Sequence, residues 1–380
     1  MQTYIHRLRE SLIKKHLDSF PCVALLGARQ VGKSTLAKNI LKDLENTLYL
    51  DLEDPRDYAK LQEPIAFLEA NQNKLICIDE VQRYPNLFPI FRSYLDQTNR
   101  NGQLLLLGSA SRALIRQSSE SLAGRISYIE IGPFVVNEVN KNKRLWLQGG
   151  YPVSYSLDES TSFDWRINYI RTFLEGDIPA LGIKIPAETL RRFWTMLAHL
   201  NGALLNASKL ASSMGVSIPT IKNYLDILEG TFVIRQLKPF HTNTKKRLIK
   251  SPKIYIRDTG LVHCLLGIES YNDLLGHPAL GTSYEAFIIN TILEHLPLYD
   301  ASFYRSSSGA EIDLVLEKGD KKIAIEIKSS ASPNLTQGFF EALKIIQPEI
   351  ALVIAPVSSP YPIKQDVWVY DINSFLDLEI

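Results

Sequence analysis

The sequence predicts an α/β fold whose first part is a parallel sheet with helices between its strands. Residues 22–26 are a short apolar run typical of a buried strand, and residues 35–44 repeat apolar side chains at helical spacing. Further apolar runs at 47–52 and 74–78 leave room for helices between them. Strands that alternate with helices along a chain are typical of a parallel sheet.

The loop between the first strand and the first helix fits the phosphate-binding pattern G-x-x-x-x-G-K-[ST] at every fixed position. A helix N-terminus presents unpaired N–H groups to a phosphate, and glycines let the backbone bend around it. Lys33 can bridge the β- and γ-phosphates of ATP, and Ser34 can bind Mg²⁺. We therefore expect a nucleotide site made by Gly27, Ala28, Arg29, Gln30, Val31, Gly32, Lys33, Ser34 and Thr35.

A second nucleotide motif ends the apolar run at 75–78, where Asp79 and Glu80 follow directly. Asp79 can hold Mg²⁺ through water, and Glu80 can orient and deprotonate the attacking water. The pattern is common by itself and becomes informative because it follows a complete phosphate-binding loop. One predicted strand lies between the two motifs, which predicts that Asp79 and the loop are on non-adjacent strands of the sheet.

Three residues beyond the apolar run 103–107 are candidates for contact with the γ-phosphate. Ser109 ends that strand. ATPases with these two nucleotide motifs place a residue that senses the γ-phosphate at this position, although a plain serine-rich turn is the alternative. Arg125 can stabilise transition-state charge in its own or a neighbouring subunit, and Arg112 is a second candidate; a surface arginine is the alternative. A role of Arg125 on a neighbour's nucleotide would require a homo-oligomer.

Residues 206–229 predict a helix-turn-helix, with the turn at Gly215 and Ser217 as the N-cap of the second helix. Two short strands follow, and the charges in residues 235–257 are all basic. A helix-turn-helix followed by a basic hairpin is a winged helix, which predicts DNA binding; docking of a protein partner is the alternative. We expect the DNA contacts to come from Lys245, Lys246, Arg247 and Lys250.

The last third of the chain predicts an α/β domain with a carboxylate centre. Asp313 lies in one predicted strand, a turn at Gly319 follows, and the next strand carries Glu326 and Lys328. Period-2 alternation places Glu326 and Lys328 on one face, where Asp313 can meet them. Such a set can bind a divalent metal and position water at a phosphodiester, so we expect Asp313 and Glu326 to be metal ligands. An amphipathic hairpin with its charges in water is the alternative.

The chain resembles the AAA+/STAND-related ATPases of bacteria and archaea, whose C-terminal domain has no known function. The resemblance spans nearly the whole chain and rests on residues 27–35, 78–82, 108–111, 121–125, 149–152 and 169–177. It implies an ATPase. The C-terminal hairpin resembles the PD-(D/E)xK nuclease fold, with Glu285 matching its helical acid and Ile312 in place of the usual proline. That fold is often retained for binding without cleavage.

Composition limits the class of protein. The 380 residues carry a net charge of +1, so any basic site must be local. Three widely spaced cysteines form no metal pattern or disulfide framework, and no apolar stretch is long enough to span a membrane. The N-terminus lacks the basic and apolar regions of a signal peptide. We therefore expect a cytoplasmic protein.

Together these patterns predict a P-loop ATPase core with a parallel sheet, a helical lid with a winged helix, and an α/β restriction-endonuclease-like domain. The expected boundaries are 1–135 for the core, 136–205 for the lid, 206–260 for the winged helix and 261–380 for the nuclease-like domain. The expected function is ATP hydrolysis, with Mg²⁺, coupled to binding of DNA, including branched DNA. The alternatives are an ATP-controlled signalling or defence switch and an ATP-regulated metal-dependent nuclease.

Overall fold

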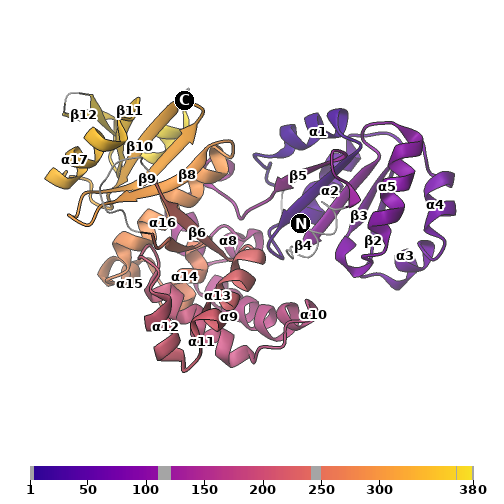
Figure 1. Cartoon of the computed structure of the whole chain (residues 1–380), viewed down its shortest axis with the longest axis horizontal. Coiled ribbons are helices and arrows are strands. Elements are labelled where there is room, and N and C mark those ends of the chain that lie inside the picture. Colours follow the sequence, from indigo (N-terminus) through magenta and orange to yellow (C-terminus); the bar gives the residue numbers. More distant parts are fainter. Residues whose placement is uncertain (1–3, 110–120, 241–249, 365, 379–380) are drawn as a thin grey trace. The chain divides into compact units, whose positions relative to one another are not determined.

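The computed structural model of the chain describes residues 4–109, 121–240, 250–364 and 366–378. The chain divides into two compact units (Figure 1). Unit 1 comprises Met1–Pro133 with Gly230–Phe232, and unit 2 comprises Phe134–Glu229 with Val233–Ile380. The predicted lid, winged helix and nuclease-like region therefore lie almost entirely within one compact unit.

Unit 1 contains, in its described part, a five-stranded parallel sheet with the strand order β2-β3-β4-β1-β5. Its strands are β1 (Cys22–Gly27), β2 (Thr47–Asp51), β3 (Leu75–Asp79), β4 (Leu104–Ser109) and β5 (Ile126–Glu130). Its helices are α1 (Glu10–Ser19), α2 (Lys33–Lys42), α3 (Pro55–Lys60), α4 (Pro64–Ala70), the 3-10 turn η1 (Val81–Arg83) and α5 (Leu87–Thr98). The parallel sheet confirms the predicted fold class, and β4 separates β3 from β1.

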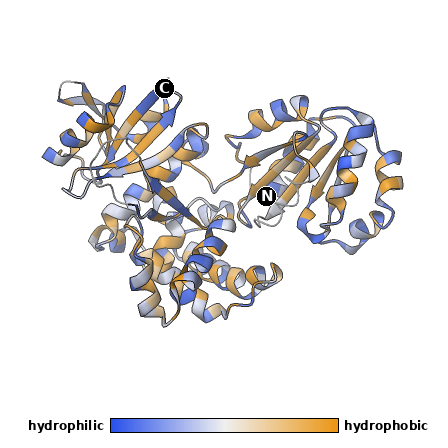
Figure 2. Ribbon diagram, viewed as in Figure 1, coloured by the Kyte–Doolittle hydropathy of each residue, from blue (hydrophilic) through white to orange (hydrophobic). Residues whose placement is uncertain are grey.

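The core of unit 1 explains why its strands are apolar along their whole length. Both faces of a parallel sheet are covered, and β1 and β3 are buried at every position (Figure 2). On one face, Ala24 and Leu26 of β1 belong to the same buried cluster as Phe88 and Phe91 of α5. Burying one such phenylalanine stabilises the fold by about 1.5–3 kcal/mol.

The segment before helix α1 is held by a buried arginine. Apolar Ile5, Leu8 and Leu12 recur at helical spacing, but the helix begins only at Glu10. Arg7 is buried, and its guanidinium donates to the carbonyl oxygens of Val31 (2.8 Å) and Gly132 (2.7 Å). These contacts hold the segment in a non-helical path.

Unit 2 contains, among its described residues, an eight-stranded mixed sheet with the order β12-β13-β11-β10-β9-β8-β6-β7. Its strands are β6 (Ile234–Pro239), β7 (Lys253–Ile256), β8 (Asp300–Arg305), β9 (Glu311–Lys318), β10 (Lys321–Ile327), β11 (Ile350–Ile354), β12 (Tyr361–Lys364) and β13 (Val367–Tyr370). Its helical elements up to the helix-turn-helix are η2 (Val136–Glu138), α7 (Asn142–Gln148), α8 (Pro152–Ser156), α9 (Glu159–Thr172), η3 (Phe173–Asp177), α10 (Ile178–Ala180), α11 (Ala187–His199), α12 (Ala207–Met214) and α13 (Ile218–Gly230). The later helices are α14 (Thr259–Leu265), α15 (Tyr271–Gly276), α16 (Leu280–His295), α17 (Gln337–Ile346) and α18 (Ile372–Leu376).

Strand β6 joins the helix-turn-helix region to the C-terminal strands. It pairs antiparallel with β7 and parallel with β8, through Lys238 opposite Ser302 and Pro239 opposite Phe303. The β6–β7 hairpin, which the sequence predicts as the wing of a separate domain, therefore belongs to the same sheet as the predicted nuclease-like strands.

The hairpin of β9 and β10 has the predicted geometry. Gly319 makes the turn with φ 60°, a left-handed conformation that glycine adopts without strain. The register pairs Leu314 with Ile325, so Asp313 and Glu326 are the next residues along the two strands. The structure thus brings these two carboxylates to neighbouring positions.

Candidate active site and carboxylate centre

The phosphate-binding loop connects β1 to α2, as the pattern predicts. Gly27 has φ 157°, and a Cβ there would lie 2.1 Å from the carbonyl oxygen of Ile131, so the backbones approach too closely for any side chain. Gly32 caps α2 with φ 95°. Both fixed glycines are therefore required by the backbone path, which leaves the first N–H groups of α2 at the loop.

Lys33 is the buried cation of this loop. Only 6% of the residue is exposed, and its Nζ donates to the carbonyl oxygens of Gly27 (2.9 Å) and Ala28 (2.8 Å). Burial lowers the pKa of the Lys33 ammonium to about 8, although the charges of Glu80 and Asp79 oppose this change. Within the described part of the chain, Lys33 forms no ion pair with a carboxylate. A bound phosphate would supply the missing negative charge.

Asp79 and Glu80 lie at the carboxyl end of β3. Asp79 is buried; its Oδ1 accepts from the Glu80 backbone N–H (2.9 Å), and its Oδ2 accepts from the Tyr49 hydroxyl. Glu80 has φ 53°, a left-handed conformation that costs a non-glycine residue about 1–3 kcal/mol and that clusters at active sites. The Gln82 side-chain amide donates to Glu80 Oε2. These contacts fix both acids at the carboxyl ends of the strands, where the phosphate-binding loop also begins.

Glu53 links the loop to the segment after β3. Its Oε1 accepts from Arg29 of the loop (3.0 Å) and from Arg83 in the turn η1 (2.6 Å). Glu53 and Arg83 were not predicted as site residues, because they lie outside both sequence motifs. Arg7 was also missed, since it reaches the loop through Val31, 24 residues along the chain.

The remaining predicted residues of the nucleotide site lie near opposite ends of the strands: some near the carboxyl ends, and one near the amino ends. Ser34 is half-buried and Thr35 exposed in the first turn of α2. The backbone of Ser109 is opposite Gly27 in the β1–β4 register, which places Ser109 beside the loop. Arg112 and the side chain of Ser109 lie outside what the structure describes.

Arg125 lies near the amino ends of the strands, away from the phosphate-binding loop. It precedes β5, whose first residue, Ile126, is opposite Cys22 at the start of β1, roughly 17 Å of strand from the loop. Arg125 forms an ion pair with Asp96 of α5. The structure does not bring Arg125 to the nucleotide site of its own chain, and its action on a neighbouring subunit stays a prediction.

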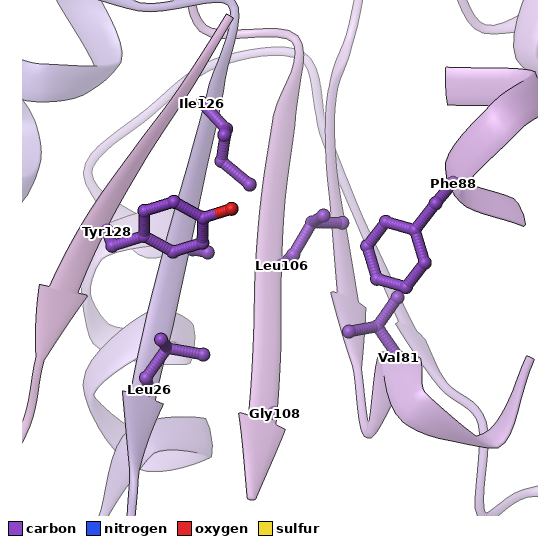
Figure 3. A pocket seen from close by; sticks show the side chains of 8 residues that line it. Leu26, Val81, Phe88, Leu106, Gly108, Ile126 and Tyr128 are labelled. Atoms are coloured by element: carbon purple, nitrogen blue, oxygen red, sulfur yellow. The ribbon is translucent and has the colours of Figure 1, made fainter. Parts of the chain in front are cut away.

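An apolar hollow on the sheet of unit 1 is distinct from this nucleotide site (Figure 3). Side chains of Leu26, Leu106 and Ile126 point into it beside those of Val81 and Phe88. The lining also includes Tyr128, which contributes one hydroxyl, but none of the lining side chains is charged. The hollow therefore lacks the cations that bind a triphosphate.

The second centre, in unit 2, gathers the predicted Glu285 and Asp313, together with Glu311, around a lysine that was not predicted there. Lys253 of β7 is 3% exposed, and its Nζ lies 3.0 Å from Glu311 Oε1, 3.2 Å from Glu285 Oε1 and 3.5 Å from Asp313 Oδ1. Burial alone would lower the pKa of Lys253, but the three carboxylates raise it above its ordinary value. The Tyr255 hydroxyl also donates to Glu285 Oε1.

Glu326 and Lys328 form the other half of this centre. Lys328 Nζ donates to Glu326 Oε1 (2.6 Å), while Asp313 Oδ2 accepts from the backbone N–H of Ile327 (2.9 Å). Burial, reinforced by the Asp313 charge, raises the pKa of Glu326 to about 8 and that of Glu285 to about 7. Among the described residues, Glu326 Oε2 is one of the few buried side-chain atoms that have no hydrogen-bond partner.

The predicted metal site at Asp313 and Glu326 is not evident from the arrangement of ligands. No group of three or more His, Cys, Asp or Glu side chains in the described parts of the chain could hold a metal ion. The two carboxylates are neighbours, but Lys253 and Lys328 are their charge partners. Metal binding there stays a prediction.

The basic residues in the stretch 235–257 are less available to contact DNA than the sequence predicts. Arg235 and Arg257 lie 3.9 and 3.1 Å from Glu294 of α16, and Lys253 is buried in the carboxylate centre. Lys250 is exposed. The predicted DNA-contact residues Lys245, Lys246 and Arg247 lie outside the described residues.

The helix-turn-helix itself is present as two helices. Gly215 ends α12 with φ 67°, and the Ser217 side chain accepts from the backbone N–H of Thr220, as expected of an N-cap. On the surface of these helices, polar side chains are exposed at Ser208, Lys209, Ser212, Ser213, Ser217, Lys222 and Asn223.

Comparison with known families divides the chain into three matches. Residues 19–140 match an AAA domain, residues 139–272 match a domain of unknown function (DUF8612), and residues 280–375 match a domain of unknown function (DUF4143). The first match covers both nucleotide motifs and every strand of the unit 1 sheet.

Two mycobacterial proteins are similar along nearly the whole chain. Uncharacterized proteins of Mycobacterium tuberculosis (Rv2008c) and Mycobacterium bovis (Mb2031c) are each 40% identical over 361 residues, which is 93% of this chain and 81% of the relative. An uncharacterized protein of Haemophilus influenzae is 25% identical over 338 residues, 79% of this chain and 80% of that protein.

Among solved structures, the Walker-type ATPase paby2304 of Pyrococcus abyssi has a similar fold. It aligns with a TM-score of 0.50 at 15% identity, over 69% of this chain and 96% of that one.

No helix in the described residues is long and apolar enough to cross a membrane.

Proposed function

This chain belongs to the same family as its mycobacterial relatives and is a P-loop ATPase, and from that premise we propose that it couples ATP hydrolysis to the binding of DNA. The observation that carries the proposal is the loop between β1 and α2. It presents a buried ammonium without a carboxylate partner in the described structure, beside two acids at the end of β3.

The residues of unit 1 divide the chemistry of hydrolysis between them. The N–H groups at the start of α2 and the Lys33 ammonium bind the phosphates. Ser34 and Asp79 would hold Mg²⁺, which neutralises charge on the phosphate oxygens when bound. Glu80 orients the attacking water and takes its proton. The fit is supported by Asp79, whose buried carboxylate is fixed by Tyr49 and by the Glu80 N–H.

DNA binding is assigned to the helix-turn-helix of unit 2. The exposed positions in α12 are polar, and the start of α13 exposes Lys222 and Asn223 beside the apolar Ile218 and Pro219. Lys209 and Lys222 supply positive charge there. Lys250 and the predicted contacts Lys245, Lys246 and Arg247 would add backbone-phosphate contacts from the β6–β7 hairpin. Arg235, Lys253 and Arg257 are excluded from this surface, because they face carboxylates of unit 2.

The proposal is tested by ATPase assays with single-stranded, duplex and four-way-junction DNA at several salt concentrations. We expect DNA to stimulate turnover and salt to remove the stimulation steeply. The double variant K209A/K222A should lose stimulation but keep its basal rate. A matched control, K184A/K344A, removes the same charge from exposed positions outside the two helices and should behave as wild type. Equal stimulation of both variants would favour a protein partner at this surface.

Assembly is part of the same proposal. Because Arg125 lies away from the loop of its own chain, a catalytic role would place it at a neighbour's nucleotide in a homo-oligomer. Mixing R125A subunits with K33A subunits should then restore part of the activity that each lacks. Full activity of a strictly monomeric protein at high dilution would contradict this role.

A further inference from the structure

Lys253 occupies the middle of the carboxylate centre. It comes from β7, whereas its partners come from α16 (Glu285) and from β9 (Glu311 and Asp313). A side chain that is 3% exposed and has three carboxylate oxygens within 3.5 Å is enclosed by opposite charge. This ammonium is therefore fixed by the fold and is not a mobile surface group.

The position of Lys253 conflicts with a metal at the same place. Carboxylate oxygens approach Mg²⁺ to about 2.1 Å and Ca²⁺ to about 2.4 Å. A cation bound to both Glu285 Oε1 and Asp313 Oδ1 would have to occupy the space between these atoms, where Nζ already lies 3.2 and 3.5 Å from them. A second cation beside the ammonium would also be repelled by it.

Three side-chain cations offset most of the charge of the four carboxylates in the centre without a metal. Lys253 pairs with Glu285, Glu311 and Asp313, Arg305 lies 3.5 Å from Glu311 Oε2, and Lys328 pairs with Glu326. Close carboxylates normally repel unless a cation separates them. Here side chains of the protein supply that cation.

We propose that the Lys253 ammonium takes the place of a divalent cation in the carboxylate centre of unit 2. The wild-type centre then loads no metal and performs no metal-dependent cleavage. Its role is to bind strand β7 to α16 and β9. The inference concerns unit 2 alone and holds whether or not the chain binds DNA.

The test measures Mn²⁺ uptake by the nucleotide-free 380-residue chain, with free Mn²⁺ followed by electron paramagnetic resonance. All proteins carry D79N, which removes the predicted carboxylate ligand of Mg²⁺ in unit 1. Wild-type Lys253 and D313N proteins should take up equal amounts of Mn²⁺. K253A should gain one site, because three carboxylates lose their cation, and K253A/D313N should lose that site again.

A thermal readout checks the same point independently. Mn²⁺ should raise the Tm of K253A and leave that of the Lys253 protein unchanged, because only the variant has a site to fill. K253M, which keeps the length of the side chain but not its charge, should respond to Mn²⁺ less than K253A, because its methyl end still fills part of the space.

Two results would overturn the proposal. One is Mn²⁺ uptake by the Lys253 protein that D313N or E285Q reduces, since the carboxylates would then bind metal beside the lysine. The other is a folded K253A that gains no Mn²⁺ site. If K253A does not fold, the comparison of the Lys253 protein with D313N and E285Q still decides the question.

Discussion

Each of the two units buries a lysine in its candidate site, Lys33 in unit 1 and Lys253 in unit 2, and the two lysines differ in their partners. Among the described residues, Lys33 donates to backbone carbonyls alone, and burial lowers its pKa to about 8. Lys253 is buried to a similar extent, but carboxylates raise its pKa above the ordinary value. Burial acts in the same direction on both, so the charge partners decide the outcome.

The difference separates a site prepared for a ligand from one completed by the protein. A buried cation without a counter-charge is stabilised when an anion arrives, which suits a phosphate-binding loop. A buried cation with three carboxylates gains little from any ligand, and its removal leaves those carboxylates without the cation that they share.

The largest expected effect is on ATP hydrolysis at the nucleotide site that contains Lys33. E80Q should keep ATP affinity and lose about 10²–10⁴-fold in kcat, because an amide cannot accept the proton of water. K33A should instead lose tight ATP binding. Calorimetric ATP titration beside steady-state turnover separates the two effects. Unchanged turnover in E80Q would remove Glu80 from the mechanism.

The second prediction compares the lysines directly through the free energy of unfolding in metal-free buffer. K253A should destabilise unit 2 by about 3–5 kcal/mol, because it removes the cation that three carboxylates share in a buried place. K33M should leave unit 1 as stable or make it more stable, because it removes a buried charge that lacks an ion-pair partner in the described structure. Denaturant unfolding, with a separate probe for each unit, checks this. A larger loss in K33M than in K253A would invert the comparison.

The third prediction extends the comparison to a buried histidine whose hydrogen-bond partners, in the part of the chain that the structure describes, are neutral. His263 donates from Nδ1 to the Leu147 carbonyl (2.9 Å), and the Ser283 hydroxyl donates to its Nε2 (2.6 Å). Burial lowers the pKa of His263 to about 3, below its ordinary value of 6.5. Between these values the unfolded chain binds the proton, so this residue's contribution to stability is lost as pH falls.

The expected slope is about 1.4 kcal/mol for each pH unit from 6.5 toward 3. It should appear as a difference between wild type and H263Q, since other groups titrate in both proteins. The opposing group is Asp258, whose pKa burial raises to about 6. Parallel stability curves for the two proteins would show that His263 is protonated in the fold.

The sequence predicted those features that depend on neighbouring residues. The loop at 27–35, the acids after β3 and the N-cap at Ser217 are each contained in a short segment, and strand alternation predicted that Asp313 lies near Glu326. Periodicity also predicted the parallel sheet of unit 1, because its strands are continuous apolar runs.

Contacts between distant segments could not be predicted in this way. Lys253 and Asp313 are 60 residues apart, and Arg7 and Gly132 are 125 apart, so no local pattern links them. Counting charges along residues 235–257 assigned Lys253 and Arg257 to a basic surface. The structure directs both toward carboxylates on elements that come later in the chain.

The pairing of β6 with β8 has a consequence for dissecting the protein. A fragment that begins at residue 281 would lack β6 and β7, so β8 would become an exposed edge strand. The same fragment would keep Glu311 and Asp313 without Lys253. Exposed edges promote aggregation, and unpaired carboxylates attract added cations. Metal uptake or insolubility in such a fragment would therefore be created by the cut, and only proteins that retain the β6–β7 hairpin report the native centre.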